Sequence, residues 1–175
     1  MLAFGQLGEQ LVSGSADRTV RVWSWSAVNA HRFATVDVAV LVGHTGAVFA
    51  LAVRPSVGLL ASGSEDGTIR LWESGPPFSC TEVLAAHSGP VRALAVLKDG
   101  RLVSGSVDTS VIIWEGVQLS QTFRAHRGAV YALLAVDDFL WSAGGEALLR
   151  SGLRKMNKIM SKFGEARSRL YAQLR

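Results

Sequence analysis

Three copies of one eleven-residue pattern constrain the fold of this chain more than any other feature. Each copy reads Ser-Gly-Ser, any residue, Asp, and ends in a Trp six residues after the Asp: SGSADRTVRVW (13–23), SGSEDGTIRLW (62–72) and SGSVDTSVIIW (104–114). A unit of about forty residues that recurs along a chain indicates a fold built by stacking copies of one small structure. The repeats therefore have to be interpreted before any single residue is assigned to chemistry.

The repeated unit extends upstream of the second and third copies. GHTGAVFALAV (43–53) and AHSGPVRALAV (86–96) precede them, so that a His lies 22 and 21 residues before the motif Asp. Each unit then reads as His, an alternating apolar segment, a turn, the SGSxD motif and a second alternating segment that ends in Trp. The interval between the first two motif Trp residues is 49 residues against 42 for the next, and we expect segment 24–40 to hold an outer strand and an enlarged loop.

The pattern is incomplete at both ends of the array. AHRGAVYALLAV (125–136) begins a fourth unit that carries Ser142 and Glu146 at the Ser and Asp places, but Gly152 stands where the Trp is expected. The first copy lacks the upstream Gly-His, because Met1 lies a few residues past its place. We therefore expect the chain to begin inside a repeat and to contain about three and a half units.

The segments between the turns predict short antiparallel strands. They are five or six residues long and rich in Val, Ile and Leu, with Gly or Asp-Gly turns between them: VFALAV, LLASGS, TIRLW, VRALAV, RLVSGS and SVIIW. Strands at this even spacing indicate an all-β repeat fold.

These residues resemble the WD-repeat β-propeller family, whose repeats carry a Gly-His pair, an Asp in a tight turn and a closing Trp-Asp pair. The resemblance covers about residues 2–145, although Gly-His becomes Ala-His after the second unit and the residue after each Trp is Ser or Glu. It implies an all-β partial propeller of about three to four four-stranded blades. The expected units are a partial blade 1–42, blades 43–85 and 86–124, a degenerate blade 125–145, and a separate tail 146–175.

In such a blade the His, the first Ser of the motif, the Asp and the Trp can form one hydrogen-bonded chain, because a buried Asp needs partners that compensate its desolvation. The expected structural sets are His44, Ser62, Asp66 and Trp72; His87, Ser104, Asp108 and Trp114; and, without a His, Ser13, Asp17 and Trp23. Ser, His and Asp together also suggest a nucleophilic triad. Three copies in one chain favour the structural interpretation, and we expect no catalytic residues.

Other chemistry is weakly supported by the sequence. Cys80 is the only cysteine, so neither an intramolecular disulfide nor cysteine-based zinc spacing is expected, and a reducing intracellular setting, cytoplasmic or nuclear, fits best. No Gly-rich phosphate loop lies between a strand and a helix. We expect no cofactor and no metal. The N-terminus lacks the pattern of a signal peptide, and no apolar run of eighteen residues predicts a membrane span.

The C-terminal segment 147–175 differs from the repeats. Apolar residues recur every seven positions in two interleaved series, which predicts an amphipathic helix with one apolar stripe: Leu149, Met156, Phe163 and Leu170, with Leu153, Met160 and Leu174. Residues 150–175 hold eight Lys or Arg against one acid, whereas residues 1–149 hold ten against thirteen. The stripe can cover the open end of the last blade, pair with another helix as a coiled coil, or bind an acidic protein or an anionic membrane. The expected tail-binding residues are Arg154, Lys155, Lys158, Lys162 and Phe163. Nucleic acid is the weakest alternative, because few aromatic residues accompany the basic ones.

The resemblance implies a non-enzymatic scaffold or adaptor that binds protein or peptide partners. In that family partners contact the residue after the first Val of the inner strand and the residue before the turn Asp, which are here Phe49, Arg92 and Tyr131, and Glu65 and Val107. The alternative is that Phe49 and Tyr131 only fill space between blades. Aromatic residues and arginine dominate interface energetics, so the positions suit a docking site.

The blade count leaves three explanations for how the stack ends. The chain can associate with a second copy or another propeller chain, it can be a fragment or regulatory module of a larger WD-repeat-containing enzyme or complex, or its tail can cover an end.

Overall fold

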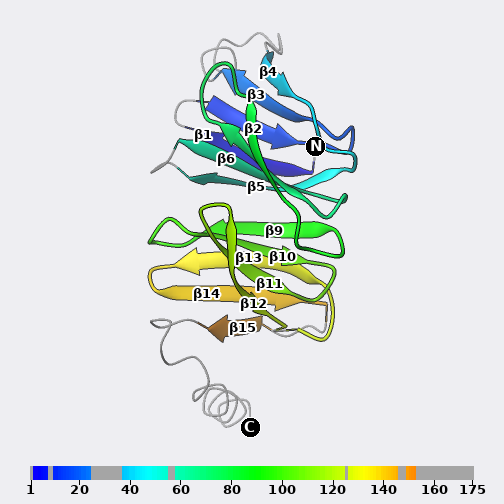
Figure 1. Cartoon of the computed structure of the whole chain (residues 1–175), viewed down its shortest axis with the longest axis vertical. Helices are drawn as coiled ribbons and strands as arrows, with labels where there is room; N and C mark the ends of the chain where they lie inside the picture. Colours follow the sequence, from blue (N-terminus) through cyan, green and yellow to red (C-terminus); the bar gives the residue numbers. More distant parts are fainter. Residues whose placement is uncertain are drawn as a thin grey trace.

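The computed structural model describes residues 2–7, 10–24, 37–54, 58–124, 126–145 and 149–152. The strands form four antiparallel sheets, which we call blades 1 to 4 (Figure 1). Blade 1 contains β1 (Ala3–Leu7), β2 (Gln10–Gly14), β3 (Val20–Ser24) and β4 (Asp37–Leu41); blade 2 contains β5 (Val48–Arg54), β6 (Leu59–Ser64), β7 (Ile69–Glu73) and β8 (Cys80–Leu84). Blade 3 contains β9 (Val91–Val96), β10 (Leu102–Ser106), β11 (Val111–Glu115) and β12 (Gln118–Phe123); blade 4 contains β13 (Val130–Val136), β14 (Phe139–Gly144) and β15 (Leu149–Gly152).

Each blade is a simple meander, because every strand pairs with the strand that follows it in the sequence. The first strand of each blade contacts the first strand of the next blade, so β1, β5, β9 and β13 form an inner row. The blades follow one another along the long axis of the molecule (Figure 1). The structure thus confirms an all-β stack of antiparallel sheets, of which three have four strands and blade 4 has three among the described residues.

The core lies between the blades in three clusters, because alternate residues of each strand face opposite neighbours. Between blades 2 and 3, for example, Leu71 and Ala61 of one blade meet Leu102 and Trp114 of the next. We call the side of a blade that faces the following blade its forward face, and the other side its rear face. The stack therefore has two outer faces, the rear face of blade 1 and the forward face of blade 4.

The glycine of each SGSxD motif has a packing role at these interfaces. A Cβ added to Gly63 would lie 2.7 Å from Cγ1 of Val91 in the next blade, and one added to Gly105 would lie 2.6 Å from Cγ1 of Val130. Gly14 has the same relation to Val48, at 2.7 Å. The missing side chain forms a socket for the first valine of the following inner strand, so the inner strands can approach closely.

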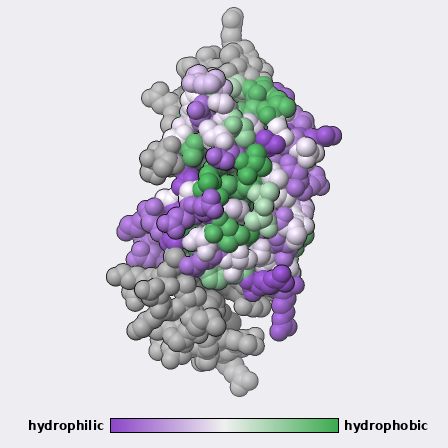
Figure 2. Space-filling model, in the orientation of Figure 1, coloured by the Kyte–Doolittle hydropathy of each residue, from purple (hydrophilic) through white to green (hydrophobic). Residues whose placement is uncertain are grey.

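Exposed apolar residues remain on the surface of this stack. Figure 2 shows hydrophobic residues gathered over the middle of the visible face and hydrophilic residues toward its margins. The most exposed of the large ones are Val42 at 73%, Leu134 at 59%, Phe4 at 58% and Tyr131 at 57%.

Two expectations about the ends of the array are wrong. Blade 1 has four strands, because the missing Gly-His precedes the inner strand and is not part of it. Blade 4 does not end at residue 145, since Leu149–Gly152 forms β15 and pairs with β14. A helix therefore does not begin at residue 147; the alternating Leu-Arg-Ser-Gly segment satisfies the backbone groups of β14 that would otherwise be unpaired. The expected helix over 153–175, with its five tail-binding residues, lies outside the described residues.

Candidate functional site

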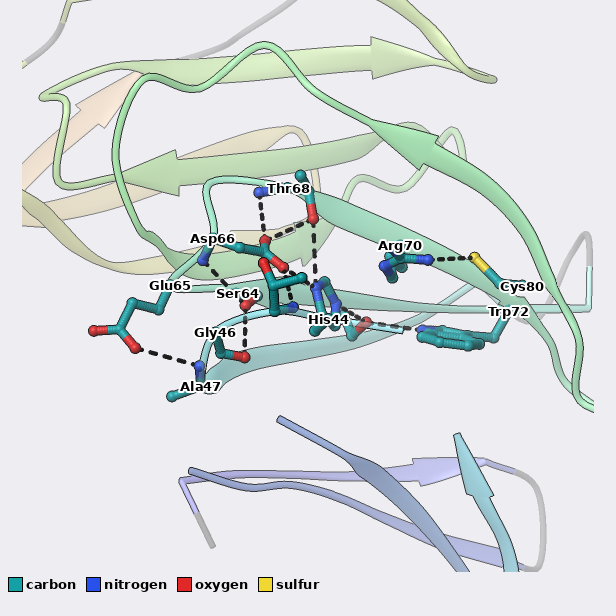
Figure 3. A network of polar contacts seen from close by, with 12 residues as sticks. His44, Gly46, Ala47, Ser64, Glu65, Asp66, Thr68, Arg70, Trp72 and Cys80 are labelled. Carbon is teal, nitrogen blue, oxygen red and sulfur yellow. Dashed lines mark hydrogen bonds and ion pairs between the residues drawn. The ribbon is translucent and has the colours of Figure 1, made fainter. Parts of the chain in front are cut away.

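In blade 2 four side chains form one continuous chain of hydrogen bonds (Figure 3). Trp72 Nε1–H donates to Ser62 Oγ at 2.8 Å, and Ser62 Oγ lies 2.7 Å from His44 Nε2. On the other side of the ring, His44 Nδ1 lies 2.9 Å from Asp66 Oδ2. These hydrogen bonds connect four segments of the repeat unit: the loop before β5, strand β6, the turn after β6 and strand β7.

The environment of this chain selects its protonation states. Burial lowers the pKa of His44 below its usual value, against the opposing effect of Asp66. The neutral ring then carries its proton on Nδ1, which donates to Asp66, while Nε2 accepts from the Ser62 hydroxyl; this tautomer follows from the network. Burial alone would raise the pKa of Asp66, but hydrogen bonds from the Thr68 hydroxyl and from the amides of Thr45 and Thr68 hold that pKa well below its usual value.

Blade 3 repeats the arrangement with nearly identical distances. His87 lies 2.9 Å from Asp108 and 2.7 Å from Ser104, and Trp114 Nε1–H donates to Ser104 Oγ at 2.9 Å. Burial would raise the pKa of Asp108, but hydrogen bonds led by the Ser110 hydroxyl lower it. The structure thus brings together all eight residues that the sequence assigns to these two sets.

Blades 1 and 4 contain half of the set each. In blade 1 Trp23 donates to Ser13 at 2.9 Å, while Asp17 is exposed and bonds to Thr19, whose hydroxyl and amide lower its pKa to about 2. In blade 4 His126 Nε2 lies 2.7 Å from Ser142 Oγ. Gly152 pairs opposite Leu140 as Trp114 pairs opposite Leu102, so glycine does occupy the Trp place.

Sequence reasoning missed a hydroxyl two residues after each motif Asp. The Thr68 hydroxyl donates to Asp66 at 2.6 Å, and Thr19 and Ser110 make the same contact in blades 1 and 3. The second Ser of the motif was also unassigned: Ser64 donates to the Gly46 carbonyl at 3.0 Å and accepts from the Asp66 amide at 3.2 Å. The recurrence of Thr or Ser in DRT, DGT and DTS is the signal that could have identified these hydroxyls.

A second group of residues lies at the start of the inner strands β5, β9 and β13, each of which has a bulge. Val48 pairs with Ser64 and Ala50 with Gly63, so Phe49 between them has no partner in the ladder. Arg92 and Tyr131 occupy the same place in blades 3 and 4. A bulge bends the strand and redirects a side chain out of the regular alternation, so these three residues belong to neither blade face.

The bulge residues of adjacent blades contact each other. The Arg92 guanidinium carbon lies 3.7 Å from the centre of the Phe49 ring, a cation–π contact between blades 2 and 3. The buried Nε of Arg92 has no hydrogen-bond partner in the structure. Tyr131 is 57% exposed, so it does not only fill space between blades.

The residues before the turn Asp lie beside this row. The amide of Glu65 donates to the Ala47 carbonyl at 2.8 Å, and the amide of Val107 donates to the Pro90 carbonyl at 2.9 Å. Both side chains are exposed. Leu2, which sequence reasoning missed, precedes β1 at the corresponding place in blade 1 and is 49% exposed. We call Leu2, Phe49, Arg92, Tyr131, Glu65 and Val107 the bulge face.

Two kinds of site are not found in the described part of the chain. Its His, Cys, Asp and Glu side chains nowhere form a group of three that could hold a metal ion. Within these same residue ranges, no helix is long and apolar enough to cross a membrane.

Known proteins support the same architecture. The model of the WD domain, G-beta repeat matches residues 2–24, 36–73 and 78–115. The mitochondrial division protein 1 of Schizosaccharomyces pombe is 33% identical over 125 residues, covering 60% of this chain and 18% of that protein. The cell division control protein 4 of Candida albicans is 31% identical over 146 residues, covering 76% of this chain and 21% of that protein. This chain thus spans about a fifth of the length of these relatives.

Two solved structures share the fold. The computationally designed Ika4 protein matches with a TM-score of 0.73 and 26% identity over 87% of this chain and 89% of that chain. The WD40 β-propeller domain of Doa1 matches with a TM-score of 0.73 and 23% identity over 91% of this chain and 52% of that chain. The family model covers more than half of the sequence, and its matches include the two complete hydrogen-bonded sets. The chain belongs to the WD-repeat (WD domain, G-beta repeat) family.

Proposed function

We propose that this chain is a non-catalytic scaffold that docks a peptide segment of a partner protein on the bulge face. The observation that carries the proposal is the Arg92–Phe49 pair beside exposed Tyr131. Arginine and aromatic side chains contribute most to interface affinity.

The chemistry of the face defines the partner. The stacked guanidinium suits a carboxylate or a backbone carbonyl, and the ring of Tyr131 suits an apolar side chain one blade further along. We therefore propose a peptide that presents an acidic residue to Arg92 and an apolar residue to Tyr131. WD-repeat relatives with roles as different as mitochondrial division and cell division control support a binding platform rather than one shared reaction.

The burial of the Ser-His-Asp sets supports the non-catalytic part of the proposal. Ser62 is 0% exposed, and its oxygen already accepts from the Trp72 indole. A nucleophile has to reach a substrate carbonyl, and this hydroxyl has no route to one without separation of the blades. A hydrolase activity that is lost in His44→Ala but kept in His87→Ala would contradict this assignment.

Selection from a random peptide library on the full chain, followed by calorimetry with the selected peptide, tests the proposal. We expect Arg92→Ala to weaken binding by about tenfold or more, since truncation of an interface hot spot costs about 2 kcal/mol. Arg124→Ala is the matched control, because Arg124 is an exposed arginine just after the outer strand β12. Equal affinity of the Arg92 and Arg124 variants would place the docking site elsewhere.

A further inference from the structure

The forward face of blade 4 is apolar and uncovered among the described residues. The pairing of β13 with β14 places six residues on it: Ala132, Leu134, Val136, Phe139, Trp141 and Ala143. Leu134 is 59% exposed, Val136 47% and Phe139 41%. The corresponding residues of blade 3, Ala93 and Ala95, are buried by the next blade at 6% and 9% exposure. An additional element therefore has to cover this face to give blade 4 the same environment.

The side chains of this face differ from those at the interfaces between blades. Ala143 pairs opposite Ala132 as Gly105 pairs opposite Ala93, so alanine stands in the socket position. In the three sockets of blades 1 to 3, a Cβ would lie within 2.6 to 2.7 Å of the incoming valine. Such overpacking costs about 1–3 kcal/mol, and valine is too stiff at χ1 to move away easily.

The next cross-strand pair on this face is also larger than its counterparts in the other blades. Trp141 pairs opposite Leu134, whereas the same places hold Val103 and Ala95 in blade 3 and Ala61 and Ala52 in blade 2. Small residues let the inner strands of adjacent blades approach, and blade 4 replaces them with large ones. The bulk of this face therefore distinguishes it from the interfaces between blades, where smaller residues meet the next blade.

We propose that the forward face of blade 4 is covered by the chain's own C-terminal segment, residues 153–175. This segment follows β15 directly and is 23 residues long. A helix of that length would span about 34 Å at 1.5 Å per residue, which exceeds the roughly 23 Å of a seven-residue strand such as β13. Protruding large side chains on a sheet suit a helix packed as a second layer.

Charge favours the same occupant. Residues 153–175 contain seven Lys or Arg and one Glu. The turn between β13 and β14 carries Asp137 and Asp138, both exposed, directly beside Val136 and Phe139 of the apolar face. The predicted stripe of Met156, Met160 and Phe163 can lie on the apolar face while flanking basic residues reach the two aspartates.

Thiol labelling of the full chain tests this proposal. In a Cys80→Ser background, Ala132→Cys places a reporter thiol on the forward face of blade 4, and Phe4→Cys places one on the rear face of blade 1. The substitutions M156S, M160S and F163S should together raise the maleimide labelling rate of the Ala132→Cys thiol by about tenfold or more, because removal of the cover exposes it. The Phe4→Cys thiol should not change.

Three matched substitutions off the stripe, N157A, S161A and S168A, provide the control and should leave both rates unchanged. Equal labelling of the Ala132→Cys thiol in the stripe variant and the parent chain would overturn the proposal. Protection that increases with protein concentration, together with a doubled mass by light scattering, would overturn it in favour of a second copy. Protection that is independent of concentration and lost only in the stripe variant would support it.

Discussion

Substitution of the first motif Ser by Ala should destabilise the four blades to different extents, according to how many side chains each Ser connects. Ser62 is fully buried and bonds to both His44 Nε2 and Trp72 Nε1. In Ser62→Ala both partners lose their hydrogen bond inside the core. A buried group left without a partner costs about 1–3 kcal/mol, so we expect a loss of about 2–5 kcal/mol in the free energy of unfolding.

The other blades provide matched controls for this magnitude. Ser104→Ala removes the same two bonds in blade 3 and should cost as much. Ser142→Ala removes only the contact of the buried His126 Nε2 with the hydroxyl, and Ser13→Ala removes only the bond from Trp23, which is partly exposed and can bond to water. We expect about 1–3 kcal/mol for Ser142→Ala and about 1 kcal/mol for Ser13→Ala.

Urea unfolding followed by far-ultraviolet circular dichroism measures these differences, provided that the slope of the transition stays constant. Ser62→Ala and Ser104→Ala should lose similar amounts of unfolding free energy, and Ser142→Ala and Ser13→Ala should both lose less. A loss in Ser13→Ala equal to that in Ser62→Ala would refute this ordering, because the cost would then come from burial of the hydroxyl and not from its partners.

Three further predictions concern pH and the contacts between blades. Burial lowers the pKa of His44, so the unfolded state binds a proton first and stability should fall as the pH drops below about 6.5. The lowered pKa of Asp66 should add a further loss of stability below about pH 4. Unfolding transitions measured over a series of acidic pH values should show both losses. Gly63→Ala should cost about 1–3 kcal/mol in urea unfolding, because its Cβ would meet Val91 of the next blade, and a neutral result would show that the socket yields. Arg54→Ala should cost about 1.5–3 kcal/mol, because the buried guanidinium donates at 3.0 Å to a backbone carbonyl of blade 3; matching stability of Arg54→Ala and Arg124→Ala would contradict that role.

The features that sequence reasoning predicted correctly are those that recur at a fixed spacing. The three SGSxD copies indicate where each meander lies, and the distance from His to Asp predicts the contact of His44 with Asp66. The contact of the Thr68 hydroxyl with Asp66 could have been predicted in the same way, because a hydroxyl residue follows the motif Asp by two positions in every copy.

The features that sequence reasoning missed depend on a partner strand. A bulge such as that at Phe49 exists only relative to the register of the neighbouring strand, so alternation within one segment does not reveal it. The strand β15 was missed for the same reason: its four residues precede a run of strong helix formers, and only pairing with β14 selects the extended conformation.

The residues of the SGSxD motif make contacts both within their own blade and with the next blade. In blade 2, Ser62 holds the blade's own His and Trp, Gly63 admits the valine of the next blade, and Ser64 secures the turn that carries Asp66. Replacement of one motif residue therefore has a specific structural consequence. Where blade 4 reads Ser-Ala, Ser142 still contacts His126, but Ala143 replaces the glycine that receives the valine of the next blade in blades 1 to 3.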